Sequence, residues 1–125
     1  MATPSDCRCT ETHEWVRSNA GGVTMGITQH AADALTDITF VGLKPVGTKL
    51  NAGDSIGEVE SVKTTSDIYS VVAGTITEVN AAAVKDPSLL NSDPYGNGWL
   101  VKIASTDTAA VMGLMDAAAY DAKHH

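Results

Sequence analysis

The sequence predicts a mainly β protein whose strands form a flattened barrel or sandwich. From Thr10 to about Ile103, short β-capable runs alternate with turn residues, a pattern that favours packed antiparallel strands over a βαβ fold. The chain has 125 residues, 43% hydrophobic and 18% charged, which is enough for one buried core and too short for a second domain. We therefore expect a single domain over residues 1–125 with its core at about 10–104.

Six runs are expected to form strands. The first of them alternates apolar and small or polar residues, as a half-buried strand does. Turn residues such as Pro45, Gly47 and Gly53 separate the runs, since they favour bends over extended backbone. The six runs are 23–28, 38–43, 55–61, 67–72, 74–80 and 99–104.

Two helices are expected. Thr28 is a suitable N-cap for a short helix that runs to Leu35, and Asp107 or Thr108 for a C-terminal helix at about 108–123, because their side-chain oxygens accept hydrogen bonds from free amides of a first turn. A break in the second helix near Asp116 is an open alternative.

Charge and hydropathy argue against two classes of partner. The net charge is −7, with 8 Lys and Arg against 15 Asp and Glu and no basic cluster, which argues against nucleic acid and anionic membranes. No apolar stretch is long enough to cross a bilayer. The N-terminus resembles neither a signal peptide nor a transit segment, so we expect a cytoplasmic protein, with a mature mitochondrial form that carries an added Met as the alternative.

The two cysteines, Cys7 and Cys9, would point to the same face of an extended strand. A redox pair or half of a metal site is one interpretation, but no further cysteine is available as a ligand, and two reduced thiols near an N-terminal edge are favoured. His124 and His125 are typical of the start of a purification tag and are set aside.

A hairpin centred on Lys63 is the most informative local feature. Two β-capable runs flank a short polar centre that lacks Gly and Asn-Gly, so a type I turn is favoured over a primed one. Lys63 then lies at or next to the apex, with its amine free to enter another protein's active site. A lone turn lysine is usually only a solvated charge, so this position alone does not define an attachment site.

The residues around Lys63 resemble the lipoylation hairpin of glycine cleavage H proteins. In that family a glutamate three residues before the lysine and a glycine eleven residues after it mark the site, and Glu60 and Gly74 stand in these places. Thr36 departs from the family, which usually has glycine there. Further similar segments follow in the family's order: Thr12-His13-Glu14-Trp15-Val16, Gly26-Ile27-Thr28, Ser66-Asp67-Ile68-Tyr69, Asn91-Ser92-Asp93-Pro94-Tyr95-Gly96 and Gly98-Trp99-Leu100.

The resemblance implies a non-catalytic lipoyl carrier with the hybrid lipoyl-domain type of fold and lipoate bound covalently to Lys63. Such a carrier takes the aminomethyl group of glycine from the pyridoxal phosphate-dependent glycine decarboxylase to an aminomethyltransferase, and a dihydrolipoyl dehydrogenase reoxidises it. A lipoate ligase or transferase would load the lysine. We expect a monomer.

The resemblance also implies a cleft that shelters the loaded arm. Its members here would be Thr12, Glu14, Ile27, Leu35 and Asp67, with the two carboxylates beside the cationic amine of the cargo. The alternative is that Glu14 and Asp67 are exposed strand and turn charges. His30 could act as an acid or base near this cleft, although a polar residue on the solvent face of its helix is favoured.

Four other functions remain as alternatives. An H-like protein can serve as a lipoyl donor or relay for 2-oxoacid dehydrogenases. A biotin carrier has methionine on both sides of its lysine, whereas Val62 and Thr64 stand here. An unmodified β interaction module would leave Lys63 free. An enzyme is least expected, because no Ser-His-Asp group, P-loop, metal-ligand cluster or pair of catalytic carboxylates is recognisable in the sequence.

Overall fold

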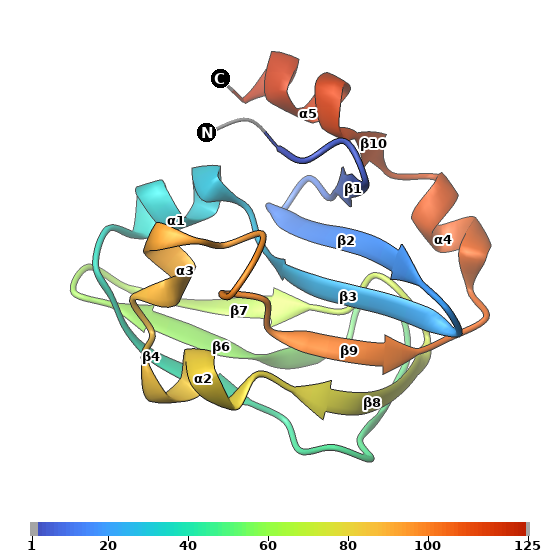
Figure 1. The fold of residues 1–125 in the computed structure, drawn as a ribbon, viewed down its shortest axis with the longest axis horizontal. Helices are drawn as coiled ribbons and strands as arrows, with labels where there is room; N and C mark the ends of the chain where they lie inside the picture. The colour runs from blue at the N-terminus through green and yellow to red at the C-terminus, as the bar shows by residue number, and fades with distance from the viewer. Residues whose placement is uncertain (1–2, 125) are drawn as a thin grey trace.

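Two antiparallel β-sheets face each other and enclose the core (Figure 1). The computed structural model describes residues 3–124. The larger sheet has seven strands, in the spatial order β10 (Met115–Asp116), β1 (Cys7–Cys9), β2 (Glu14–Asn19), β3 (Gly22–Ile27), β9 (Val101–Ala104), β8 (Gly74–Val79) and β5 (Lys49–Leu50). The smaller sheet has three, in the order β4 (Ile38–Leu43), β6 (Ser55–Ser61) and β7 (Thr65–Tyr69).

The core lies between the sheets. Met25, Ile76 and Ile103 of the larger sheet and Ile56 and Val59 of the smaller one are at most 1% exposed and belong to one cluster. Along β7 only Ile68 is buried, because successive side chains of a strand point to opposite faces. Each sheet therefore gives one face of its strands to a shared apolar layer.

Strand β3 is more buried than the sequence pattern predicts. Its residues from Val23 to Ile27 are all buried, where alternation predicted a half-buried strand. The second face is covered because Trp15 lies against it: a Cβ built at Gly26 would come within 2.7 Å of the Trp15 indole nitrogen. The prediction of a strand here is confirmed, and that of a solvent face is wrong.

The first helix begins where its cap predicts. Helix α1 (Gln29–Leu35) has Thr28 as its N-cap, and the Thr28 hydroxyl accepts from the amide of Ala31 at 3.2 Å. Two further short helices follow β8, α2 (Ala81–Lys85) and α3 (Leu89–Ser92). In Figure 1 these three helices lie together at one end of the sheets.

The C-terminal segment forms two helices. Asp107 caps α4 (Thr108–Met112), accepting from Ala110 at 3.4 Å, and Asp116 caps α5 (Ala117–Lys123). Between the helices, β10 pairs with β1 and extends the larger sheet beyond the expected core range at both ends. The prediction of one continuous helix at about 108–123 is therefore wrong, and the alternative with a break near Asp116 is confirmed. Asp116 caps the new helix, and its side chain accepts from the Ala119 amide at 2.8 Å.

Strand β7 ends earlier than predicted. Residues 70–72 do not continue the strand, because the Ser70 hydroxyl bonds to the carbonyl oxygen and the amide of Val72 at 2.6 and 3.3 Å and closes a turn. At its other end β7 starts at Thr65, two residues before the expected boundary.

A second cluster joins the two ends of the chain. It contains Cys7, Cys9, Trp15, Tyr95 and Tyr120. The N-terminal segment and α5 lie side by side (Figure 1), and the amide of Thr3 donates to Asp121 at 3.0 Å. The two ends therefore close over the outer face of the large sheet.

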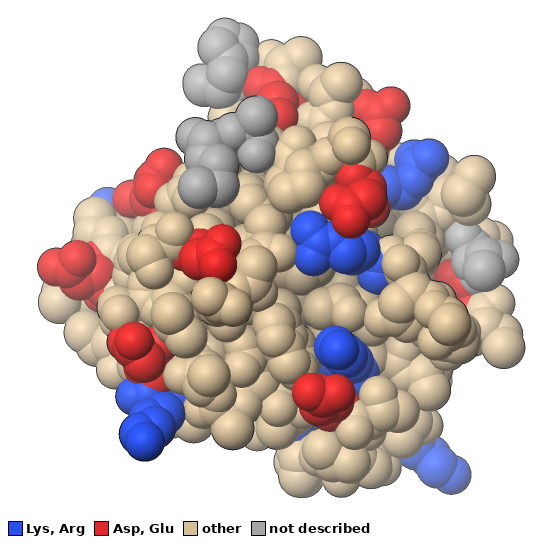
Figure 2. Space-filling model, viewed as in Figure 1, with Lys and Arg blue, Asp and Glu red and all other residues tan. Residues whose placement is uncertain are grey.

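The surface carries scattered charges of both signs. Figure 2 shows acidic and basic side chains spread over this face without a basic cluster. No helix within residues 3–124 is long and apolar enough to cross a membrane.

Candidate functional site

The tip of the β6–β7 hairpin is a tight turn with Lys63 at its third position. Glu60 pairs with Thr65, and the Ser61 amide donates to the Thr64 carbonyl at 2.8 Å. The Ser61 hydroxyl accepts from the amides of Lys63 and Thr64 at 3.2 and 3.1 Å. Within residues 3–124 the non-glycine residues with positive φ are His13 and Thr36, so this turn is not of a primed type, as the sequence predicts.

The hairpin tip rests against the end of α1. The amide of Val62 donates to the Asp37 carbonyl at 3.1 Å, and Nζ of Lys63 donates to the Ala34 carbonyl at 3.4 Å. Lys63 is exposed and forms none of the ion pairs found in the described part of the chain. The 3.1 Å bond from Val62 holds the backbone of the tip in place. The 3.4 Å bond from the Lys63 amine is weak, so the amine is easily released.

Glu60 and Gly74 lie in different sheets. Glu60 is a partly exposed residue of β6, opposite Phe40 of β4 and Thr65 of β7. Gly74 starts β8, where a Cβ would come within 2.1 Å of the Ala104 carbonyl oxygen on β9. The fold itself therefore requires a glycine at this position, whatever else recognises it.

Glu14 is a buried carboxylate with oriented donors. Glu14 is only 2% exposed. Oε1 accepts from the hydroxyls of Thr10 and Thr12 at 2.5 Å each, and Oε2 accepts from the amide of Tyr69 at 3.3 Å. Ile27 pairs with Glu14 across β2 and β3. Thr12, Glu14 and Ile27 are thus brought together, next to the end of β7.

Asp67 and Leu35 are placed differently. Asp67 is exposed and pairs with Glu58 across the hairpin, and both line an open depression on the outside of the smaller sheet with Phe40 and Lys44. No hydrogen bond or ion pair between the described side chains links Asp67 to Glu14. Leu35 is half-buried at the end of α1, against the core.

His30 is exposed, as expected for the solvent face of α1. Its ring is nevertheless 4.5 Å from that of His13 and 5.3 Å from that of His124, measured between centroids. No local pattern in the sequence predicts this grouping, because the three histidines are far apart along the chain and only the tertiary structure brings them together.

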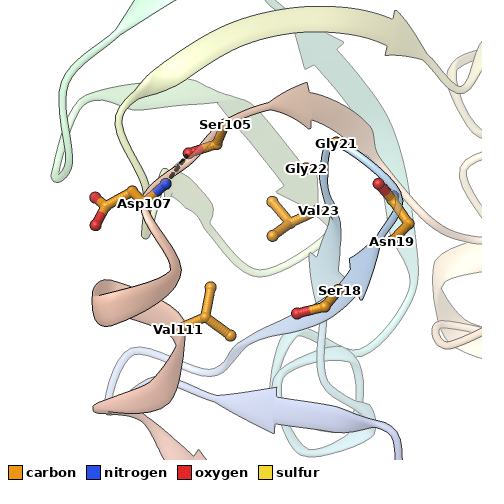
Figure 3. A pocket seen from close by; sticks show the side chains of 8 residues that line it. All are labelled: Ser18, Asn19, Gly21, Gly22, Val23, Ser105, Asp107 and Val111. Atoms are coloured by element: carbon orange, nitrogen blue, oxygen red, sulfur yellow. Dashed lines mark hydrogen bonds between the residues drawn. The ribbon is translucent and has the colours of Figure 1, made fainter.

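A cavity of about 140 Å³ lies at the other end of β3 (Figure 3). Its lining includes Gly22, Val23, Ser105 and Val111, and its one ionisable side chain is that of Asp107. That carboxylate already caps α4, and the Asp107 amide donates to the Ser105 hydroxyl at 3.0 Å. This arrangement explains Asp107 as a structural residue.

The two cysteines are free, buried and on one face of β1. Burial raises the pKa of Cys7 to about 11 and that of Cys9 to about 12. Both are therefore neutral thiols at neutral pH, which suits packing and not redox chemistry.

Comparison with known proteins identifies the family. Residues 7–125 match the family model described as "Glycine cleavage H-protein". The chain belongs to this family. Among its relatives, the glycine cleavage system H proteins of Cronobacter sakazakii and Streptomyces coelicolor are 49% and 50% identical, over 95% and 88% of this chain and 93% and 89% of their own.

The fold of the family is shared as well. The crystal structure of a glycine cleavage system H protein from Mycobacterium marinum superposes with a TM-score of 0.88 at 43% identity, covering 97% of this chain and 98% of the other. The expected family, its mainly β sandwich and the link to the glycine cleavage system are confirmed. The functions assigned to the individual site residues stay predictions.

Proposed function

We propose that this chain is the lipoyl carrier of the glycine cleavage system and that lipoate is bound through an amide to Nζ of Lys63. The observation that carries the proposal is the exposed amine at a fixed hairpin tip, in a chain of the H-protein family. The site fits the group, because converting this ammonium to an amide removes no ion pair and only one 3.4 Å hydrogen bond.

The chain's own residues fix the point from which the arm extends. Ser61 holds the turn through its hydroxyl, and the bond from Val62 to Asp37 ties the tip to the start of β4. When bound, lipoate would supply a dithiolane that accepts and releases the aminomethyl fragment of glycine. A fixed origin limits the volume that a flexible arm explores.

Glu14 is the residue that we propose as counter-charge for the cationic cargo. It is buried and its oxygens are already oriented by Thr10, Thr12 and the Tyr69 amide, so it would need little rearrangement to receive an ammonium group. Thr12 and Ile27 would line the same place. Leu35 follows the carbonyl that Lys63 contacts, and Asp67 precedes Tyr69 by two residues, which makes them the outer members of the proposed cleft.

The proposed partners follow from the family. They are the pyridoxal phosphate-dependent glycine decarboxylase, the aminomethyltransferase and the dihydrolipoyl dehydrogenase, with a lipoate ligase or transferase that reads Glu60 and Gly74. In this function the chain is a substrate of these enzymes and performs no turnover itself. We place it in the cytoplasm, as a monomer.

Loading by a lipoate ligase tests the attachment site. With ATP and lipoate, the intact chain should gain the mass of one lipoyl group, and the peptide that contains Lys63 should carry it. Lys63→Arg should gain nothing, whereas Lys49→Arg, which changes another exposed lysine on β5, should be loaded like the wild type. Loading of Lys63→Arg would overturn the site, and a biotinyl mass would overturn the cofactor.

Reconstitution tests the pathway. The loaded chain, mixed with the other three components, should support release of CO2 from glycine. A fully loaded chain that supports none would overturn the cleavage function and favour a relay to 2-oxoacid dehydrogenases.

A further inference from the structure

Three histidines from distant segments meet beside α1. His13 lies in the turn before β2, His30 in α1, and His124 directly after α5. The centroids of the His13 and His124 rings are 4.8 Å apart. One ring nitrogen of each histidine lies within 4.8 Å of those of the other two. Among the residues that the structure describes, this is the one group of three or more His, Cys, Asp or Glu side chains that could hold a metal ion.

His13 is oriented as a metal ligand usually is. Its Nδ1 is 2.7 Å from the Tyr120 hydroxyl, which in turn is 2.8 Å from the Thr28 hydroxyl. Ligating histidines commonly have their second ring nitrogen held by an oxygen, which fixes the tautomer and the plane of the ring. With a metal at Nε2, Nδ1 keeps its proton and donates to Tyr120, and Tyr120 can donate to Thr28.

The sequence of His124 and His125 is typical of the start of a tag, but the structure packs the His124 ring against the rings of His13 and Tyr120, at 4.8 and 4.7 Å between centroids. The Nε2 of His124 is buried and has no hydrogen-bond partner, and among the side chains that the structure describes it is the one buried nitrogen or oxygen without such a partner. Leaving a buried polar atom without a partner is unfavourable. A bound cation would satisfy this nitrogen if it is the unprotonated one.

An ion pair ties together the two segments that carry His13 and His124. Glu11, two residues before His13, accepts from Nζ of Lys123 through both carboxylate oxygens at 2.9 Å. Lys123 directly precedes His124, so this pair helps to hold the two imidazoles in the same place.

We propose that His13, His30 and His124 bind a Zn²⁺ ion. Imidazole nitrogens suit this metal, and Zn–N bonds of about 2.0–2.1 Å in tetrahedral geometry place ligand nitrogens about 3.4 Å apart. Since the three nitrogens already lie within 4.8 Å of one another, small ring rotations of the exposed His30 and of His124 close the site. Water takes the fourth position.

The metal would join three parts of the fold. His13 precedes the buried Glu14, His30 belongs to the helix whose end contacts Lys63, and His124 ends the C-terminal helix. A ligand that binds only the folded state stabilises it. The site would thus fasten the end of α5 beside the proposed carrier site, without being required for attachment of lipoate.

Titration of residues 1–125, without an added tag, with ZnCl₂ tests the site. We expect one Zn²⁺ per chain by calorimetry and a rise in Tm with zinc. His30→Gln, a change at an exposed position, should weaken binding at least about tenfold, a loss in the range caused by disturbing metal sites, and should abolish the rise in Tm. His13→Gln and His124→Gln should do the same.

His125→Gln is the matched control, because it also removes one C-terminal imidazole but none of the three ligands. It should bind Zn²⁺ like the wild type. Equal weakening in His124→Gln and His125→Gln without an effect of His30→Gln would overturn the site, since the terminal pair would then bind on its own. Absence of saturable binding below about 100 µM, a Kd that corresponds to a weak site, would overturn it too.

Co²⁺ gives a second measurement. Tetrahedral Co²⁺ has intense visible bands that octahedral, mainly water-bound Co²⁺ lacks, so the wild type should develop them and His30→Gln should not. Weak octahedral bands in the wild type would contradict the proposed three-nitrogen site.

Discussion

Thr36 is the residue at which the backbone is most clearly strained. It ends α1 with φ of 62° and ψ of −140°, a conformation that β-branched residues rarely adopt. The side-chain Nδ2 of Asn91 donates to the Thr36 carbonyl at 2.6 Å and so holds this conformation in place. The family resemblance identified Thr36 as a departure from glycine, and the positive φ gives the physical reason why glycine is favoured there.

Thr36→Gly is therefore expected to raise the free energy of unfolding by about 1 kcal/mol, the relief of strain being partly offset by the greater freedom of glycine in the unfolded chain. Urea denaturation measures the change. Thr36→Ala is the matched control, because it removes the same hydroxyl but keeps a Cβ, and it should give no gain. A loss of stability in Thr36→Gly would show that the Thr36 hydroxyl, which donates to the Leu35 carbonyl at 2.5 Å, matters more than the strain.

At the same scale, the sequence indicates the candidate site residues but not their contacts. Lys63 was located by motif, and its exposed turn position agrees with that prediction. The contact of its amine with Ala34, the tie from Val62 to Asp37 and the donors around Glu14 join segments that are far apart in sequence. Such contacts depend on how the two sheets pack, which local residue patterns do not encode.

Among the elements, the edge of β8 gives the sharpest prediction. A Cβ at Gly74 would meet the carbonyl oxygen of Ala104 at 2.1 Å and Cγ2 of Ile103 at 2.8 Å, so the two strands would have to separate. We expect Gly74→Ala to lower the free energy of unfolding by about 1–3 kcal/mol, the usual cost of overpacking.

The same variant separates two roles of Gly74, the packing of β8 on β9 and recognition by the lipoate ligase. If Gly74 matters only for the packing of β8 on β9, the folded fraction of Gly74→Ala should be lipoylated at the wild-type rate per folded molecule. A variant that keeps wild-type stability would contradict the proposed clash. Glu60→Gln, at a partly exposed position, is the control that probes recognition without a packing change.

Elements with strong local signals were predicted, and very short ones were not. Thr28 and the following apolar residues define α1 on their own, and the runs at β4 and β6 have the predicted bounds. By contrast, β5 and β10 have two residues each, too few for any periodicity. They form because each lies beside a strand with which it can pair: Leu50 pairs with Gly74 of β8, and Asp116 pairs with Arg8 of β1.

At the scale of the whole molecule, the closure of the chain ends over the large sheet creates a region that is sensitive to alkali. Cys7, Cys9 and Tyr120 share one buried cluster. Burial raises the pKa of Cys9 from 9.0 to about 12, that of Cys7 from 9.0 to about 11 and that of Tyr120 from 10.0 to about 12. In the unfolded chain these groups ionise at their ordinary pKa, whereas the folded protein keeps them neutral.

A raised pKa in the folded state gives stability that is fully present below the unfolded pKa and is lost as pH rises through the folded one. The free energy of unfolding should thus fall between about pH 9 and pH 12, as urea denaturation at a series of pH values under reducing conditions would show. Cys9→Ala removes one of the ionising groups, so its stability should fall less steeply with pH, by up to one proton per molecule. Equal slopes in the variant and the wild type would mean that Cys9 ionises as readily in the folded protein as in the unfolded chain, and that the ends of the chain open before the sheets do.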